Sequence, residues 1–384
     1  MNNFVFQNPT RLIFGRGSIA RLGQEIDSNK RILLLFGGGS ARKNGVYDQV
    51  KEALKNHFFM EFWGIEPNPD YDTAMKAVRL ARENGIDYLV AVGGGSVIDA
   101  TKFIAHAIPY EGEPWDLVAD TSLVKKTTPL ATVLTTPATG SEMNHRGVLS
   151  RRSTQEKVSF VTPWSFPRFS ILDPDVCKTL PVRQIANGVV DAFVHVMEQY
   201  LTYPNHDLLM DRWAEGVLQT LVEIGPRVTG PEPDPEAIDN FMLSATMALN
   251  GFVSIGTPQD WATHRIGYEL TILYGLAHAE TLAVLYPALL KVLKEQKKEK
   301  LVQYADRVWN ITDGTPDEIA EKAIAQTEKF FREMGLPVRM QDYGVPEEAV
   351  DLMYSRLKER GAVYGEHNNV TPEVAREIFI RSRE

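Results

Sequence analysis

The chain has 384 residues, of which 43% are hydrophobic and 24% charged, a composition typical of a folded globular protein with enough length for two domains. Its 41 basic and 50 acidic residues give a net charge of −9, which argues against a nucleic-acid partner and against an anionic membrane surface. The single cysteine, Cys177, excludes an internal disulfide framework and a cysteine-based zinc site. Together with an N-terminus unlike a signal peptide, it predicts a cytoplasmic protein.

The first half of the chain alternates short apolar runs with helical patterns. Helical periodicity predicts helices at residues 71–84 and 97–107. Unbroken apolar strands that alternate with helices indicate a parallel sheet covered on both faces. The predicted strands are 31–36, 87–92 and 130–134, with weaker candidates at 157–161 and 169–172.

The pattern changes near residue 181, and almost every later segment has helical periodicity. We therefore expect two domains, an α/β domain over residues 1–181 and an all-α domain over residues 182–384. The helices predicted in the second domain are 182–201, 207–227, 233–251, 258–266, 279–295, 298–308, 315–334, 346–360 and 371–383.

Two identical glycine-rich segments follow predicted strands. Gly37-Gly-Gly-Ser40 comes directly after one strand, and Gly93-Gly-Gly-Ser96 comes after the next and opens a helix. Glycine lets backbone N–H groups approach phosphate oxygens, and the N-terminus of a helix favours negative charge. One such segment could be only a tight turn, but two of them indicate phosphate binding. Residues 1–181 are therefore predicted to be a dinucleotide-binding domain.

The residues after the first glycine segment indicate which dinucleotide binds. NAD-binding proteins usually hold the adenosine ribose 2′-hydroxyl with an acidic residue near the end of an early strand. No Asp or Glu lies between Phe36 and Asp48, where Ser40, Arg42 and Lys43 could instead accept a 2′-phosphate. The two basic side chains could also be merely exposed at the start of a helix, but the pattern favours NADP.

Four residues of the second half can give one metal ion an oxygen and three nitrogens. Asp191 and His195 are four apart on one face of a predicted helix with apolar neighbours, where a buried, unpaired carboxylate would be costly. His264 and His278 complete the set. Any one of these histidines alone is more simply a core residue, whereas the four together favour ligands. One Asp and three His suit Zn²⁺ or Fe²⁺, so residues 182–384 are predicted to bind metal.

The two later histidines cannot reach one ion from a single straight helix. Fourteen residues at 1.5 Å each would separate His264 and His278 by about 21 Å. The chain must therefore turn back between them, and Gly267 and Gly275 are the candidate break points.

In order along the chain, these residues resemble the iron-containing (group III) alcohol dehydrogenase family, in particular its branch of NADPH-dependent butanol dehydrogenases and broad-specificity aldehyde reductases. The likeness runs across the whole chain and is densest from residue 1 to about residue 290. The matching segments are Asn8-Pro-Thr-Arg-Leu-Ile-Phe-Gly15, Phe36-Gly-Gly-Gly-Ser40, Glu66-Pro-Asn-Pro69, Val92-Gly-Gly-Gly-Ser-Val-Ile-Asp99, Pro137-Ala-Thr-Gly-Ser-Glu142, Asn187-Gly-Val-Val-Asp-Ala-Phe-Val-His195 and Pro258-Gln-Asp-Trp-Ala-Thr-His264.

This resemblance implies a fold like that of dehydroquinate synthase, with an α/β N-terminal dinucleotide-binding domain, an all-α C-terminal domain and the active site in the cleft. It implies a homodimer, and it implies that the metal is held by Asp191, His195, His264 and His278. Around NADP(H) it implies Gly37, Gly38, Ser40 and Asn68 at the adenosine end and Gly94, Gly95, Ser96 and Asp99 at the pyrophosphate. It further implies Thr135, Thr136, Thr139 and Ser141 along the cofactor, Asn144 and Lys157 further along, and Thr179 and Leu180 near the adenine.

The sequence departs from the family pattern at one position. Many relatives carry a second histidine four residues after the one that matches His264, near the nicotinamide, where it is a candidate proton relay; here that position is Tyr268. Tyr268, Tyr274 or solvent could supply the proton, and both tyrosines could equally be packing residues.

A metal and a dinucleotide together predict hydride transfer at a metal-polarised carbonyl, by an NADP-dependent, iron- or zinc-containing alcohol dehydrogenase that reduces small aldehydes. One alternative is a metal-dependent hydrolase or lyase, including a cyclising enzyme that resembles dehydroquinate synthase and uses NAD and zinc together. Another is a non-catalytic nucleotide sensor, which would not need four metal ligands.

Overall fold

The computed structural model of the chain describes all 384 residues. They divide into two compact units, one formed by Gln7–Pro181 and the other by Val182–Glu384 with the N-terminal segment Met1–Phe6. The first unit is built on a parallel sheet and the second is helical. The predicted fold class is therefore confirmed.

Six parallel strands form the sheet of the first unit, in the spatial order β1-β8-β5-β4-β2-β3. The four inner strands are apolar and almost wholly buried, as expected for a parallel sheet covered on both faces. The strands are β1 (Arg11–Phe14), β2 (Arg31–Phe36), β3 (Phe58–Phe62), β4 (Tyr88–Gly93), β5 (Leu130–Leu134) and β8 (Phe169–Leu172).

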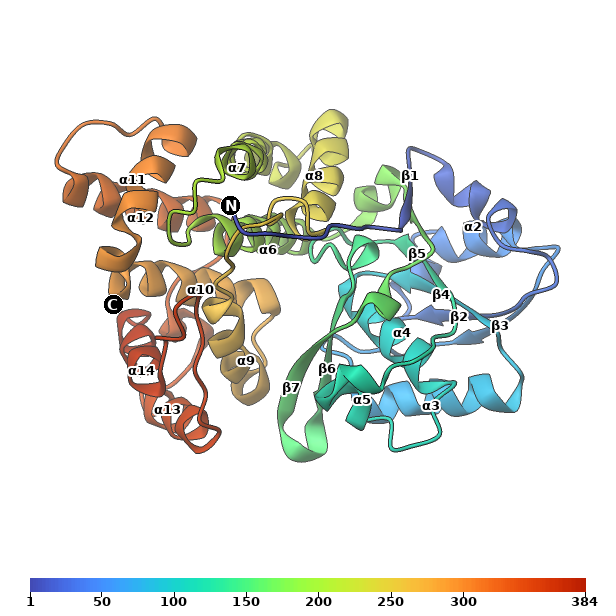
Figure 1. Ribbon diagram of the computed structural model, residues 1–384. Helices are drawn as coiled ribbons and strands as arrows, with labels where there is room; N and C mark the ends of the chain where they lie inside the picture. The colour runs from blue at the N-terminus through green and yellow to red at the C-terminus, as the bar shows by residue number, and fades with distance from the viewer. The chain divides into compact units, whose positions relative to one another are not determined.

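Helices lie on both sides of this sheet. In Figure 1, α2 lies on the opposite side from α3 and α4, which pack against each other. The α-helices of this unit are α1 (Ser40–Lys43), α2 (Val46–Ala53), α3 (Tyr71–Glu83), α4 (Gly95–Ala107) and α5 (Asp116–Ala119). The 3-10 helices are η1 (Ser18–Gln24), η2 (Thr121–Leu123), η3 (Ser141–Met143), η4 (Arg152–Thr154), η5 (Pro163–Ser165) and η6 (Pro174–Thr179).

The direction in which the chain crosses the sheet reverses between β2 and β4. From β2 it moves outward to β3, and from β4 it moves the other way to β5 and β8. Phe36 at the end of β2 pairs with Val92 of β4, so Gly37 and Gly93 leave neighbouring strands at the same edge. Ligands of open α/β sheets bind outside the carboxyl ends of the strands at such a reversal, which is where both glycine segments lie.

One predicted strand lies outside the parallel sheet. Residues 157–161 fall in β7 (Glu156–Val161), which pairs antiparallel with β6 (Arg146–Arg151) in a separate two-stranded ribbon. β6 packs on α4. The half-exposed pattern of β7 fits a ribbon covered on one face only.

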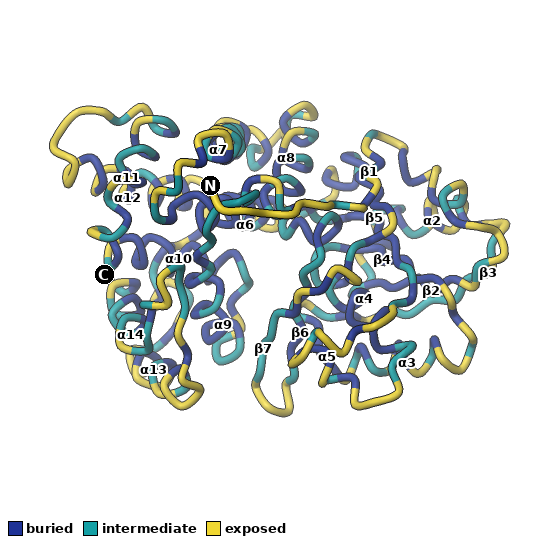
Figure 2. The backbone as a smooth tube through the Cα atoms, viewed as in Figure 1, coloured by how far each residue is buried: buried dark blue, intermediate teal, exposed yellow.

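The second unit consists of helices around two that are almost wholly buried. Fifteen of the 19 residues of α6 and 12 of the 15 residues of α10 are buried, and both helices are drawn mainly in dark blue in Figure 2. No helix of the chain has the length and apolar character needed to cross a membrane. The helices are α6 (Val182–Tyr200), α7 (Leu208–Thr229), α8 (Pro235–Ala248), α9 (Ala262–Tyr274), α10 (His278–Val292), α11 (Lys294–Trp309), α12 (Pro316–Glu333), η7 (Met340–Tyr343), α13 (Ala349–Glu359) and α14 (Pro372–Arg381).

The prediction for the segment around His264 was wrong in its bounds. A helix was expected over 258–266 with a break at Gly267 or Gly275, but α9 runs through Gly267 and ends at Gly275, which has a left-handed φ of 72°. Gly267 serves close packing instead of a break. A Cβ there would lie 2.8 Å from Oγ1 of Thr281 on α10, so α9 and α10 approach more closely than any larger residue would allow.

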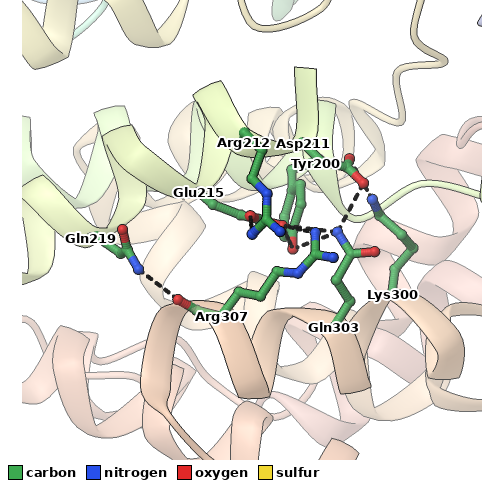
Figure 3. A network of polar contacts seen from close by, with 8 residues as sticks. All are labelled: Tyr200, Asp211, Arg212, Glu215, Gln219, Lys300, Gln303 and Arg307. Carbon is green, nitrogen blue, oxygen red and sulfur yellow. Dashed lines mark hydrogen bonds and ion pairs between the residues drawn. The ribbon is translucent and has the colours of Figure 1, made fainter. Parts of the chain in front are cut away.

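A buried polar network joins α7 to α11 and to the end of α6 (Figure 3). The carboxylate of Glu215 accepts from the Tyr200 hydroxyl at 2.9 Å and from Gln303 and Arg307 of α11, each also at 2.9 Å. Lys300 donates to Asp211 at 2.6 Å. Because buried Glu215 and partly buried Asp211 are both paired, the network is explained by helix packing and needs no ligand.

Candidate functional site

Three helices bring the four predicted metal ligands into one cluster. Asp191 and His195 lie on successive turns of α6, His264 lies in the first turn of α9, and His278 is the first residue of α10. Each offers a ligand atom, and all four atoms lie within 4.8 Å of one another. Asp191 Oδ1 is 3.6 Å from Nε2 of His195 and 3.7 Å from Nε2 of His278.

The spacing and chemistry of this cluster fit a divalent transition metal. Ligand bonds of about 2.1 Å place the corners of a tetrahedron about 3.4 Å apart, close to the shorter separations found here. One carboxylate with three imidazoles suits Zn²⁺ or Fe²⁺. The site would then carry a net charge of +1, since Asp191 neutralises one of the two positive charges. His278 is the most exposed ligand, with 27% of its side chain accessible, so the cluster is open on that side.

A further carboxylate holds one of the histidines. Glu198, three residues after His195 on α6, accepts hydrogen bonds from Nδ1 of His264 and from the backbone N–H of Thr263, the latter at 2.8 Å. With Nδ1 used as a donor, Nε2 is the atom of His264 left to bind a metal. Burial and the nearby Asp260 carboxylate raise the pKa of Glu198, while the Thr263 N–H and Lys297 oppose that shift.

The chain enters α9 through a strained turn fixed by buried charges. Trp261 precedes α9 with a left-handed φ of 64°, a costly backbone conformation for a bulky residue. Asp260 holds this turn, because its Oδ1 accepts from the Ala262 N–H and its Oδ2 accepts from Lys297 at 2.8 Å. The Trp261 ring lies 5.2 Å from that of His264, so the strained residue is next to one of the predicted metal ligands.

The start of α10 is fixed in a similar way. Glu280 accepts from the backbone N–H of Ala277 at 2.9 Å, just before His278. Arg183 of α6 donates from Nε to the same carboxylate at 3.0 Å. The position of His278 is therefore tied to α6, the helix that carries Asp191 and His195.

In the α/β unit, the second glycine segment packs directly on the loop that follows β5. A Cβ on Gly94 would lie 3.0 Å from the Cβ of Thr136, and one on Gly95 would lie 2.5 Å from both Oγ1 and Cγ2 of Thr139. Thr135 bonds to the same turn, donating its N–H to the Gly93 carbonyl at 3.0 Å. The structure thus brings this group of predicted cofactor residues together, with Ser96 in the first turn of α4.

A network of polar side chains holds the loop 135–144, which follows β5, against α4 and β6. Asp99 accepts from the Ser141 hydroxyl at 2.6 Å and from the Val148 N–H at 3.0 Å, so its carboxylate holds the loop to β6. Lys102 donates to Ser141 at 2.8 Å and to the Asn144 side chain at 3.0 Å. Burial lowers the pKa of Lys102 to about 8, against the opposing effect of the Asp99 and Glu142 carboxylates.

The remaining predicted cofactor residues lie in the first glycine segment, in a hydrogen-bonded pair between residue 68 and β7, and at the end of η6. Gly37 follows β2, Gly38 has open space where a Cβ would stand, and Ser40 begins α1. Asn68 and Lys157, far apart in sequence, are joined by a 2.8 Å hydrogen bond from the lysine to the amide oxygen. Thr179 and Leu180 end η6, after β8.

The site contains residues that sequence reasoning did not single out. Glu198 and Lys102 each lie three residues after a predicted site residue on the same helix face, a spacing that could have identified them. Glu61, at the end of β3, has no sequence signal of its own, because it lies outside residues 36–48, where a ribose-binding acid is expected. Tyr268 follows His264 by one turn of α9 and is buried. This position is compatible with a proton donor and with a packing residue.

Comparison with known proteins gives consistent matches across both units. The profile described as iron-containing alcohol dehydrogenase matches residues 9–174, and that of the C-terminal domain of the same family matches residues 185–379. The chain is 47% identical to NADPH-dependent aldehyde reductase YqhD of Escherichia coli, over the full length of both. It is 38% identical to probable NADH-dependent butanol dehydrogenase 1 of Bacillus subtilis, over 97% of each chain. The crystal structure of E. coli YqhD superimposes with a TM-score of 0.98 at 47% identity, covering 100% of this chain and 99% of that one.

Proposed function

This chain belongs to the iron-containing alcohol dehydrogenase family, and from that premise we propose that it is a metal-dependent aldehyde reductase. It uses NADPH to convert small aldehydes to primary alcohols, and the reverse reaction is that of a butanol dehydrogenase. The observation that carries the proposal is the cluster of Asp191, His195, His264 and His278, whose ligand atoms lie within 4.8 Å of one another.

The four residues of this cluster would contribute differently to holding a cation. Asp191 supplies the one anionic ligand, and the three imidazoles bind without adding charge. A divalent metal held by these residues would supply Lewis-acid chemistry, stabilising the negative charge that develops on a carbonyl oxygen during reduction. Glu198 and Glu280 keep two of the ligands in place, so the cluster does not need to reorganise when a substrate arrives.

The glycine segments hold the dinucleotide. The N-terminus of α4, formed by Gly94, Gly95 and Ser96, is proposed to bind the pyrophosphate, because its free backbone N–H groups and the helix dipole favour a negative charge. The close packing of Gly94 on Thr136 and of Gly95 on Thr139 fixes the position of this turn. NADPH held here would supply the hydride, while the protein would orient it and exclude water. Asp99 and Asn144 act as supports for the loop 135–144, since their side chains are engaged within the α/β unit.

The cofactor preference rests on this chain's own residues. By their names, the E. coli relative uses NADPH and the B. subtilis relative uses NADH, so membership of the family leaves both open. Ser40, Arg42 and Lys43 after the first glycine segment favour NADPH, and that choice makes aldehyde reduction the working direction in cells.

Tyr268, one turn after His264, is the proposed proton donor to the product, with solvent as the other source.

We also propose that the enzyme is a cytoplasmic homodimer. The N-terminal segment supports the dimer, because Phe4 is 52% exposed and Val5 fully exposed, and such apolar side chains commonly become covered on association. Light scattering after gel filtration tests this part independently of activity. A mass of twice 43.1 kDa is expected, and a mass of 43.1 kDa would refute it.

Absorbance at the reduced-nicotinamide band tests the function. With butyraldehyde, NADPH is expected to be oxidised faster than NADH, and the rate should be lost on chelation and restored by Zn²⁺ or Fe²⁺. Faster oxidation of NADH would refute the cofactor assignment alone. No oxidation of either cofactor by the metal-loaded protein would refute the reductase and favour a lyase or hydrolase built on the same fold.

A further inference from the structure

An aromatic stack lies beside the first glycine segment, where β2 and β3 end. The ring of Phe36, the last residue of β2, stacks on the indole of Trp63 with centroids 4.1 Å apart and planes 7° from parallel. The guanidinium carbon of Arg42, on α1, lies 4.0 Å from the centroid of the same indole. Trp63 thus stacks on Phe36 and also makes a cation–π contact with the guanidinium of Arg42.

The carboxylate of Glu61 makes hydrogen bonds to two aromatic residues of this stack and a long ion pair with Arg42. Glu61 accepts from the indole Nε1 of Trp63 at 2.8 Å and from the hydroxyl of Tyr47 at 2.7 Å. Its separation from Arg42 is longer, at 3.8 Å. Because both carboxylate oxygens of Glu61 already accept from aromatic residues, this acid is poorly placed to accept from a ribose hydroxyl as well.

Arg42 is held but remains accessible. Its side chain is 57% exposed, although its guanidinium carbon lies over the indole of Trp63. A planar guanidinium fixed by stacking keeps its N–H edges in a constant orientation, which is the arrangement that binds phosphate oxygens in pairs. The stack also reduces the side-chain entropy that phosphate binding would otherwise cost.

We propose that Trp63 is a positioning residue for cofactor selectivity, which holds Arg42 so that it recognises the 2′-phosphate on the adenosine ribose. This inference rests on the proposed function only in taking the first glycine segment as the adenosine end of a dinucleotide site. It assigns selectivity to the stack of Phe36, Trp63 and Arg42, with Glu61 as the hydrogen-bonded clamp. Lys43, the neighbouring cation, has no such support.

Calorimetric titration with 2′,5′-ADP and with 5′-ADP tests the proposal without metal, aldehyde or turnover. The wild-type chain is expected to prefer 2′,5′-ADP by about tenfold to a hundredfold. Arg42→Leu should remove most of that preference. Trp63→Leu should reduce it by about two- to fivefold, the contribution of an exposed cation–π contact, whereas Trp63→Phe keeps an aromatic face and should change it by less than about twofold. Affinity for 5′-ADP should stay constant throughout, which shows that the site remains folded.

A matched control separates stacking from net charge. Arg79→Leu removes the same charge from an exposed position of α3 and should leave the preference unchanged. An unchanged preference in Trp63→Leu, or a preference lost in Lys43→Leu and kept in Arg42→Leu, would overturn the inference and leave the proposed function standing. Equal wild-type affinity for the two nucleotides would also overturn the inference, whereas binding of neither would remove the dinucleotide site itself.

Discussion

Glu198 accepts a hydrogen bond from Nδ1 of His264, so a proposed metal ligand on α9 is oriented by a carboxylate on α6. The same carboxylate accepts from the N–H of Thr263, and both donors are buried. A carboxylate behind a ligating imidazole fixes the ring orientation and makes the ligand more basic. The two helices are thereby joined at the point where the metal would bind.

Glu198→Gln should weaken metal binding by about ten- to a hundredfold, the usual effect of losing such a partner. Thr263 and His264 donate to different oxygens of Glu198, and glutamine has an NH2 group in place of one of them, so one of these two hydrogen bonds is lost. Competition with a coloured chelator measures the affinity. Glu295→Gln, on the exposed first turn of α11, is the matched control and should bind metal as the wild type does. Wild-type affinity in Glu198→Gln would refute the orienting role.

Asp191→Ala should abolish bound metal and lower the aldehyde-reductase rate by at least about a hundredfold, because it removes the only anionic ligand. The fold should survive, since the change also removes the cost of a buried carboxylate. Metal content by mass spectrometry and the circular dichroism spectrum check the two halves of this prediction. Asp306→Ala, an exposed change on α11, should alter neither. Full activity in Asp191→Ala would eliminate the metal site.

Gly95→Ala should lower the free energy of unfolding by about 1–3 kcal/mol, because the new methyl group would lie 2.5 Å from Thr139. Gly38→Ala supplies the comparison within the first glycine segment. No atom lies within 4 Å of its added Cβ, so its thermal unfolding should match that of the wild type. Thermal melts without cofactor measure both variants. Equal melting temperatures for the two would contradict the close approach of Gly95 to the loop after β5.

Lys102 should make stability depend on pH in the alkaline range. Its pKa is lowered from 10.5 in the unfolded chain to about 8 in the folded protein. Between those values the unfolded chain binds one proton more than the folded chain, so stability rises with pH, by up to about 3 kcal/mol from this group. Below pH 8 both states are protonated and the cost of the buried charge is fully present.

Lys102→Met isolates this effect, because the other alkaline titrations are common to both proteins. The free energy of unfolding is measured with urea from pH 7 to pH 10.5. The value for the wild type minus the value for the variant should increase as pH rises. A constant difference across the range would show that Lys102 keeps an ordinary pKa when folded.

The inner strands could be predicted closely because burial on both faces leaves a continuous apolar run. Residues 31–36 and 130–134 form strands with the predicted bounds. β3, at the edge of the sheet, gave no comparable signal, since four of its five residues are only partly buried and none fully. The antiparallel partner of β7 was missed because β6 contains Gly147 and arginines, which local propensity does not favour in a strand.

Glycine patterns were informative in some places and ambiguous in others. At Gly275 the predicted break occurs, whereas Gly267 lies within α9 because Thr281 approaches it from α10. A sequence cannot distinguish a glycine that ends a helix from one that admits a neighbouring helix, since both need the same missing side chain.

The pairing of Asn68 with Lys157 has no local signal either, because it depends on where the ribbon β6–β7 folds back.

The most direct test of the account is the fate of deuterium from NADPH labelled at both C4 positions, with butyraldehyde and the metal-loaded protein. Mass spectrometry of the product should find butan-1-ol with one deuterium on C1, and no labelled alcohol should form after chelation or with Asp191→Ala. Unlabelled butan-1-ol, or label transfer that continues unchanged without the metal, would contradict metal-assisted hydride transfer by this protein.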